Sequence, residues 1–213
     1  DAINGARYYG VGNEYEGVTI ASAVFALAVL LNYKKISKWL AVVLSLVILI
    51  TSAMPSMGAN VGGAISESVA YLLFILLIFD VKLDLKKIIM IGVATVLIVV
   101  AFAGLDFLMG TESHLAVFTN QIIQEGPAAI FNTFGRKIQM NLKLAKSSVW
   151  VNILIVSIII IGALIFKPSG YFKKIHDKYP MIFKGFMASF VGCIVTLLVN
   201  DSGIVAASTA AIY

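Results

Sequence analysis

Long apolar runs alternate with short polar segments along the whole sequence. Six runs are nearly free of charge and are too long for strands, which makes them helix candidates. They cover residues 13–31, 39–54, 64–79, 88–110, 150–166 and 181–199, and an apolar tail after Gly203 would begin a seventh. A transmembrane helix needs about 20 mostly apolar residues. The pattern therefore predicts an all-α, polytopic integral membrane bundle of about six to seven transmembrane helices.

A polar, glycine-rich stretch from Pro55 to Ser68 separates the second and third runs. Pro55 would end the preceding helix, and Gly58, Gly62 and Gly63 permit backbone approaches that a side chain would block. Both neighbouring runs are short, and paired short or Gly/Pro-interrupted spans point to a site lined by irregular backbone. We expect a turn at the outer membrane surface, with Glu67 in the first turn of the next helix.

Two further local patterns bear on the helices. Asn13 and Glu16 have the spacing of a capping box, in which the second side chain reaches back to the first residue, so capping would explain Glu16 without a function.

The long connection after the fourth run has apolar residues at intervals of four opposite basic ones, which predicts an amphipathic outer helix on the membrane. These residues are Ile130, Phe134, Ile138 and Leu142, opposite Arg136, Lys137, Lys143 and Lys146.

Composition supports a membrane protein. Of 213 residues, 60% are hydrophobic and only 13% are charged, against about 25% charged in soluble domains. We expect residues 1–213 to form a single membrane domain, and a segment of a longer chain, since the sequence begins at Asp1 and ends inside an apolar stretch. The single cysteine, Cys193, excludes an internal disulfide and a cysteine metal cluster.

Basic residues predict the orientation. The net charge of +5 could suggest nucleic acid, but the lysines cluster in short loops beside apolar runs, so no nucleic-acid partner is expected. Placing loops on alternate sides puts Lys34, Lys35, Lys38, Lys82, Lys86, Lys87, Lys167, Lys173, Lys174, Lys178 and Lys184 together. By the positive-inside rule this side is cytoplasmic. The glycine-rich turn and Asn200–Gly203 then face outside a cell membrane.

Polar residues at the outer ends of the runs predict an outward-facing pocket. A carboxylate at the centre of a membrane helix costs about 2.5–3.5 kcal/mol, so acids at this depth need partners or water. The candidate substrate-binding residues are Arg7, Asn13, Glu14, Asn60, Gly62, Gly63, Glu67, Asp106, Asn200 and Asp201. The alternative to a pocket is equally open: these acids lie in ordinary interfacial solvent, and residues 200–203 form a plain turn.

The ligand chemistry stays open. Gly62 and Gly63 at a helix start could hold a phosphate through free amides, but Glu67 beside them opposes a bare anion. A cation, or an anion accompanied by a metal or by Arg7, fits better. The carboxylates Glu14, Glu67, Asp106 and Asp201 could hold Mg²⁺ or Ca²⁺, although their spacing matches no metal motif. The sequence leaves the identity of any cofactor unknown.

Several short motifs together resemble the membrane domain of a poorly characterised bacterial family. They are residues 5–14 (GARYYGVGNE), 58–63 (GANVGG), 113–115 (SHL), 147–150 (SSVW) and 200–205 (NDSGIV). The resemblance implies a C-terminal membrane module of a cell-envelope protein whose polypeptide also carries an extracytoplasmic alkaline-phosphatase-like domain. That domain would perform phosphoryl or sulfuryl chemistry with residues absent here. Ala116 and Val117 stand here where the family's His-Leu-Gly-Arg pattern has glycine and arginine, so the family's arginine is missing from this sequence.

Three functions follow as hypotheses. The preferred one is a membrane module whose outer pocket binds, presents or translocates an envelope substrate, such as a lipid-linked anion, with membrane lipids as its surroundings. The second is a membrane-embedded enzyme that uses outer carboxylates as acid and base on a lipid-linked sugar or phosphate. The third is an anchor for the phosphatase-like domain. The sequence does not decide between an enzyme and a binding module.

Overall fold

The computed structural model describes residues 10–54, 56–109, 126, 128–167 and 170–212. These residues contain helices and turns and no strand, which confirms the all-α prediction for this part of the chain. The helices are α1 (Asn13–Asn32), α2 (Lys38–Ala53), α3 (Val61–Ile78), α4 (Leu85–Met109), α6 (Ala128–Ser147), α7 (Trp150–Phe166), α8 (Gly170–Lys178), α9 (Pro180–Val199) and α10 (Gly203–Ala211). Arg7 lies outside the described residues.

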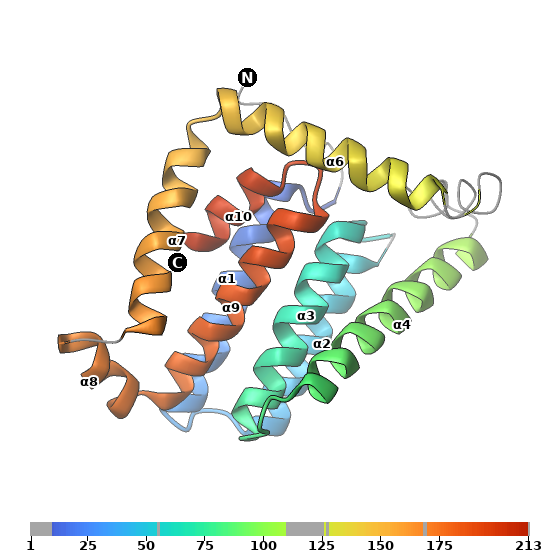
Figure 1. Ribbon diagram of the computed structural model, residues 1–213. Coiled ribbons are helices and arrows are strands. Elements are labelled where there is room, and N and C mark those ends of the chain that lie inside the picture. Colours follow the sequence, from blue (N-terminus) through green and yellow to red (C-terminus); the bar gives the residue numbers. More distant parts are fainter. Residues whose placement is uncertain (1–9, 55, 110–125, 127, 168–169, 213) are drawn as a thin grey trace.

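Helices α1, α3 and α9 form the centre of the bundle (Figure 1). The most extensive contacts join α9 to α3 and to α1, and α10 packs against α1, α9 and α7. Helices α2 and α4 flank α3. Helix α6 lies across one end of the bundle, and α7 turns away from it through a bend of 98°.

The helix ends follow from local sequence. Ser37 caps α2 by accepting a hydrogen bond from the Leu40 amide, and Asn60 caps α3 by accepting from the Gly63 amide. Pro180 lies in the first turn of α9, where its missing N–H is no loss. The chain leaves α1 and α3 through residues with positive φ, Lys34 and Asp80.

Three local predictions need correction. Helix α1 has Gly12 as its N-cap with no side-chain cap, so the Asn13–Glu16 capping box is wrong. Helix α3 begins at Val61, so the turn after Pro55 is shorter than predicted and Glu67 lies in the second helical turn. The loop after α7 contains a helix, α8, which is short and highly charged and therefore gave no apolar run.

The surface of the bundle is apolar and its interior is unusually polar. Exposed side chains of α2, α4 and α7 are mainly Ile, Leu and Val, whereas two glutamates, two asparagines and several hydroxyl residues are buried. Water-soluble proteins rarely bury acidic residues, which are mostly exposed in them. This distribution fits a bundle surrounded by lipid, in which polar residues face inward.

Four helices are long and apolar enough to cross a membrane: α1, α3, α4 over Leu85–Asp106, and α9. A fifth span is possible if the bent pair Gly135–Ser147 and Trp150–Leu164 counts as one. Helix α2 is apolar but shorter, with 16 residues. These counts apply to the described residues, and they support a multi-span membrane protein.

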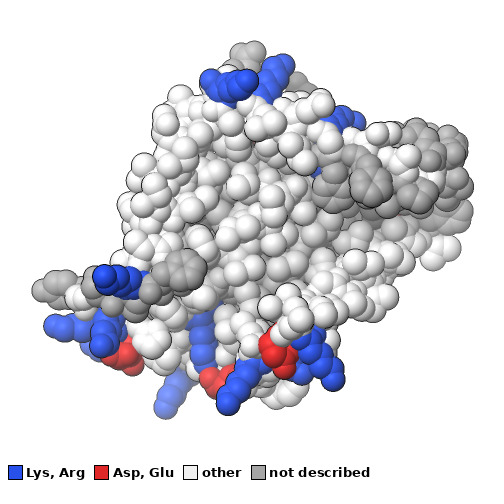
Figure 2. Space-filling view, in the orientation of Figure 1, with Lys and Arg blue, Asp and Glu red and all other residues white. Residues whose placement is uncertain are grey.

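Charged side chains collect at two ends of the molecule. Figure 2 shows a band without charge between a lower end with both basic and acidic side chains and an upper end with basic ones. The α1–α2 and α3–α4 connections and α8 all lie at the lower end (Figure 1), where Tyr33 contacts Tyr179 and Lys38 pairs with Asp80. The lysine-rich loops thus share one end, which we call the lysine-rich end.

Asp80 connects three helices at the lysine-rich end. Its carboxylate pairs with Lys184 of α9 and, at 3.4 Å, with Lys38 of α2. The hydrogen bond from Lys184, followed by the charges of Lys184 and Lys38, holds the pKa of Asp80 below its usual value.

This pKa shift predicts a pH effect. A carboxyl whose pKa is lowered by folding adds stability above its unfolded pKa, about 3.9 for Asp, and loses it as the pH falls through the folded value. We expect the wild type to lose stability as the pH falls below about 4, and Asp80→Asn to lose less over the same range. Thermal unfolding in detergent measures this, and identical pH profiles would contradict it.

Gly17 sets the contact between α1 and α10. A Cβ at this position would fall on the Ala206 carbonyl oxygen and the Thr209 hydroxyl. Helices in membranes approach this closely only where one of them carries a small residue.

Gly17→Ala should therefore lower the free energy of unfolding by about 1–3 kcal/mol, the usual cost of overpacking. Gly92→Ala in α4 is the matched control, because a Cβ there meets nothing within 4 Å. Unfolding by SDS titration compares the two. Equal stability of both variants would show that the α1–α10 contact is looser than described.

Candidate functional site

A carboxylate lies buried at the end of the bundle opposite the lysine-rich end. Glu16, in the first turn of α1, is 0% exposed. Its two oxygens accept hydrogen bonds from Asn60 Nδ2 at 2.9 Å, Asn200 Nδ2 at 2.7 Å and Thr196 Oγ1 at 3.3 Å. Because these donors come from the start of α3 and the end of α9, Glu16 joins all three central helices. We call Glu16, Asn60, Thr196 and Asn200 the Glu16 cluster.

Asn60 has three partners. Its Oδ1 accepts from the Gly63 amide at 2.9 Å, and its Nδ2 donates both to Glu16 and to the Val11 carbonyl at 3.1 Å. The Val11 amide in turn donates to the Gly58 carbonyl at 2.8 Å. The segment before α1 is thereby fixed to the turn before α3. Since the Gly63 amide is already bonded, it is not free to hold a phosphate.

Asn200 lies directly against α3. A Cβ on Gly62 would collide with the Asn200 side-chain oxygen, so a glycine is required for this contact. Asn141 of α6 secures the same turn, since its Nδ2 donates to the Asn200 carbonyl at 3.1 Å and its Oδ1 accepts from the Ile204 amide at 3.2 Å. Lys137 donates to the Val199 carbonyl. Helix α6 thus covers the α9–α10 turn with polar side chains.

Glu67 of α3 is a second fully buried carboxyl and differs sharply from Glu16. Neither of its oxygens has a hydrogen-bond partner within the described part of the chain. Its polar neighbours are Ser52 of α2 and the Glu16 carboxylate. One helical turn further, the Tyr71 hydroxyl is also buried without a partner among the described residues. A carboxyl buried in this way needs a ligand, a proton or water to offset its desolvation.

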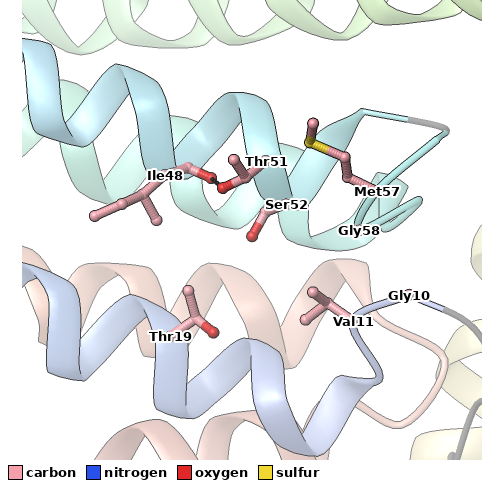
Figure 3. Close-up of a pocket in the computed structure, with 8 residues that line it drawn as sticks. All are labelled: Gly10, Val11, Thr19, Ile48, Thr51, Ser52, Met57 and Gly58. Carbon is pink, nitrogen blue, oxygen red and sulfur yellow. Dashed lines mark hydrogen bonds between the residues drawn. The ribbon is translucent and has the colours of Figure 1, made fainter.

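A cleft of about 520 Å³ opens between α1 and α2. Its lining residues are Gly10, Val11, Thr19, Ile48, Thr51, Ser52, Met57 and Gly58. Figure 3 shows the Ser52 hydroxyl pointing into the gap between the two helices, while the Thr51 hydroxyl is bonded to the Ile48 carbonyl at 2.8 Å. The cleft therefore has hydroxyl and apolar walls, and Ser52, which lines it, also interacts electrostatically with Glu67.

The structure brings together five of the predicted site residues: Asn60, Gly62, Gly63, Glu67 and Asn200. Asn13 and Glu14 are half-buried at the start of α1. Asp201 is exposed and pairs with Lys137 at 3.9 Å, so it lies outside the Glu16 cluster. Asp106 is buried near the end of α4 and interacts with another residue there.

Two parts of the predicted site need correction. No group of three or more His, Cys, Asp or Glu side chains suited to a metal occurs among the described residues, so the four predicted carboxylates do not gather around Mg²⁺ or Ca²⁺ there. Glu16, set aside as a cap, is the most highly bonded acid of the site. Thr196 and Ser52 were not predicted, because a hydroxyl inside an apolar run carries no local signal.

Comparison with known proteins adds no functional assignment: no family model, curated protein or solved structure matches this chain.

Substitutions of two neighbouring residues at the end of α9 test how much the Glu16 cluster stabilises the fold. Asn200→Ala removes the 2.7 Å donor to Glu16 and should lower the free energy of unfolding by about 1.5–3 kcal/mol, as for a hydrogen bond to a charged group. Asp201→Ala removes an exposed, weakly paired acid and should change it by about 0.5 kcal/mol or less. SDS titration measures both variants, and equal losses would contradict the assigned role of Asn200.

Proposed function

We propose that this chain is the membrane module of a cell-envelope protein, and that its α1–α2 cleft binds, presents or translocates an envelope substrate. The observation that carries the proposal is the cleft itself, which lies at the lysine-poor end of an apolar bundle that also buries an unpartnered carboxyl, Glu67. A passive anchor needs neither buried acid, since each costs free energy inside a membrane.

The proposed topology has six crossings, by α1, α2, α3, α4, α7 and α9. The connections between these helices alternate between the two ends of the bundle, which supports it (Figure 1). With the lysine-rich end in the cytoplasm, the cleft and the α2–α3 turn face outside. Helix α6, which exposes Ile138 and Leu142 beside Arg136 and Lys143, then lies on the outer membrane surface.

The chemistry of the cleft narrows the substrate class. Its walls carry the hydroxyls of Thr19, Thr51 and Ser52 together with Ile48 and Met57, and no charged side chain lines it among the described residues. Such walls suit the junction between a hydroxyl-rich headgroup and an apolar chain. A lipid-linked sugar fits better than a bare anion, because a lipid-linked phosphate would need a cation, which the described walls of the cleft do not supply.

The resemblance to envelope proteins with an alkaline-phosphatase-like domain supports the same proposal. In such a protein the membrane module would hold a lipid-linked substrate where an outer domain can reach it. An enzyme acting through Glu16 and Glu67 is the second candidate, favoured by the nearness of these two carboxyls. Turnover of a lipid-linked sugar by the isolated chain would select that candidate over binding alone.

A filled cleft tests the proposal. Thr19→Phe places a ring in the cleft, whereas Val43→Phe, on the exposed face of α2, adds a ring of the same size where lipid would surround it. We expect native mass spectrometry of detergent-released protein to show a specific bound lipid in the wild type and Val43→Phe, and its loss in Thr19→Phe. No bound species in any of the three would overturn the proposal and favour an anchor.

A further inference from the structure

The buried acids Glu16 and Glu67 are neighbours with unequal surroundings. Glu16 receives hydrogen bonds from Asn60, Thr196 and Asn200, whereas the Glu67 oxygens receive none from the described residues. Two neighbouring carboxylates inside a bundle repel each other, and one set of donors can stabilise only one of them as an anion. The donors satisfy the Glu16 oxygens and leave those of Glu67 without one among the described residues, so of the two Glu67 is the acid that needs a proton or a positive partner.

The helices around Glu67 supply no such partner from the described residues. Helix α3 packs against α1, α2, α4 and α9. The charge that acts on Glu67 is the negative one of Glu16 in α1, and α2 presents the neutral Ser52. Lys184 of α9 pairs with Asp80 at the lysine-rich end. The remaining titratable residues of these helices are Glu14, Tyr15, Lys38, Tyr71, Lys86, Lys87, Asp106 and Cys193, and of these Tyr71 is a further neighbour of Glu67.

A metal ion is a poor partner for Glu67. Ca²⁺ and Mg²⁺ take six or more oxygen ligands and Zn²⁺ takes four ligands, and the described residues contain no cluster of three metal-ligating side chains. Phe74 and Tyr71 follow Glu67 into the apolar core of α1, α2 and α3. A proton needs one oxygen and no coordination shell, so it meets the requirement in this space.

We propose that Glu67 is an exchangeable proton-binding site, and that Ser52 connects it to the α1–α2 cleft. Ser52 lines the cleft from α2, which packs against α3, and it is the α2 side chain that interacts with the Glu67 carboxyl. The proposal deepens the proposed function, because a ligand in the cleft would sit where the proton enters and leaves. Binding in the cleft and protonation of Glu67 are then coupled.

The transfer balances as a relay. A hydronium ion in the cleft gives a proton to Ser52 Oγ, and a new O–H bond forms there. The original O–H bond of Ser52 breaks, its proton passes to a Glu67 oxygen, and the carboxylate becomes a neutral carboxylic acid. The cleft loses one proton, Glu67 gains one, and Ser52 is unchanged.

Infrared spectroscopy of the whole chain in lipid nanodiscs tests the site directly. We expect the wild type at neutral pH to show the carbonyl band of a protonated carboxyl, lost in Glu67→Gln and kept in Glu14→Gln, a half-buried acid of α1. If the Gln variant does not fold, Glu67→Asp should shift the band. A band that stays unchanged in both Glu67 variants, or no such band in the wild type, would overturn the proposal.

The relay has its own test. Ser52→Ala should keep the carboxyl band but slow its shift on transfer to deuterated water, because the hydroxyl that carries the proton is gone. Thr51→Ala removes a neighbouring cleft hydroxyl that is bonded to its own helix and should leave the exchange rate unchanged. Equal exchange in the wild type and Ser52→Ala would overturn the role of Ser52.

These results separate the inference from the proposed function. A protein that shows the Glu67 band but retains no lipid would keep the proton site and lose the substrate cleft. A protein that retains lipid equally at all pH values, with no Glu67 band, would keep the cleft and lose the proton site. Coupling predicts that lipid retention changes with pH in the wild type and not in Glu67→Gln.

Discussion

The arrangement of this bundle depends on one buried carboxylate. Glu16 brings a carboxyl group into the interior, and Asn60, Asn200 and Thr196 offset its desolvation by donating to both of its oxygens. Asn60 in turn fixes the segment before α1 to the turn before α3. Asn200 fixes the α9–α10 turn, which α6 covers through Asn141. Helices distant in sequence are therefore held by a single polar centre at one end.

The same centre gives the second acid its chemistry. The side-chain amides of Asn60 and Asn200 donate to Glu16. Glu67 has no hydrogen-bond partner within the described chain, and Ser52, which interacts with it, lines a cleft with hydroxyl walls. The outer surface of the bundle is apolar instead, with exposed Ile, Leu and Val side chains on α2, α4 and α7. The buried polar groups of Glu16, Asn60 and Asn200 lie at one end of the bundle, and acidic side chains appear on the surface at the opposite, lysine-rich end (Figure 2).

Much of the helical order could be predicted from the sequence, because apolar runs of this length have few alternatives; α7 has the predicted bounds Trp150–Phe166. The candidate site was predictable only in part. Asn60 and Asn200 stand out at helix ends, but the partners of Glu16 lie 44 and 184 residues away, and a local capping pattern offered a competing explanation for that acid. Tertiary contacts decided its role, and local spacing does not encode them.

The central claim is that the cleft faces outside while the lysine-rich end faces the cytoplasm. The chain has one native cysteine, Cys193, which is buried, so an introduced thiol can be labelled against a low background. The most direct measurement is labelling of Thr51→Cys in the cleft and Lys35→Cys in the α1–α2 connection with a membrane-impermeant thiol reagent on intact cells. The account predicts that Thr51→Cys reacts at once and Lys35→Cys only after permeabilisation. The reverse order would contradict it.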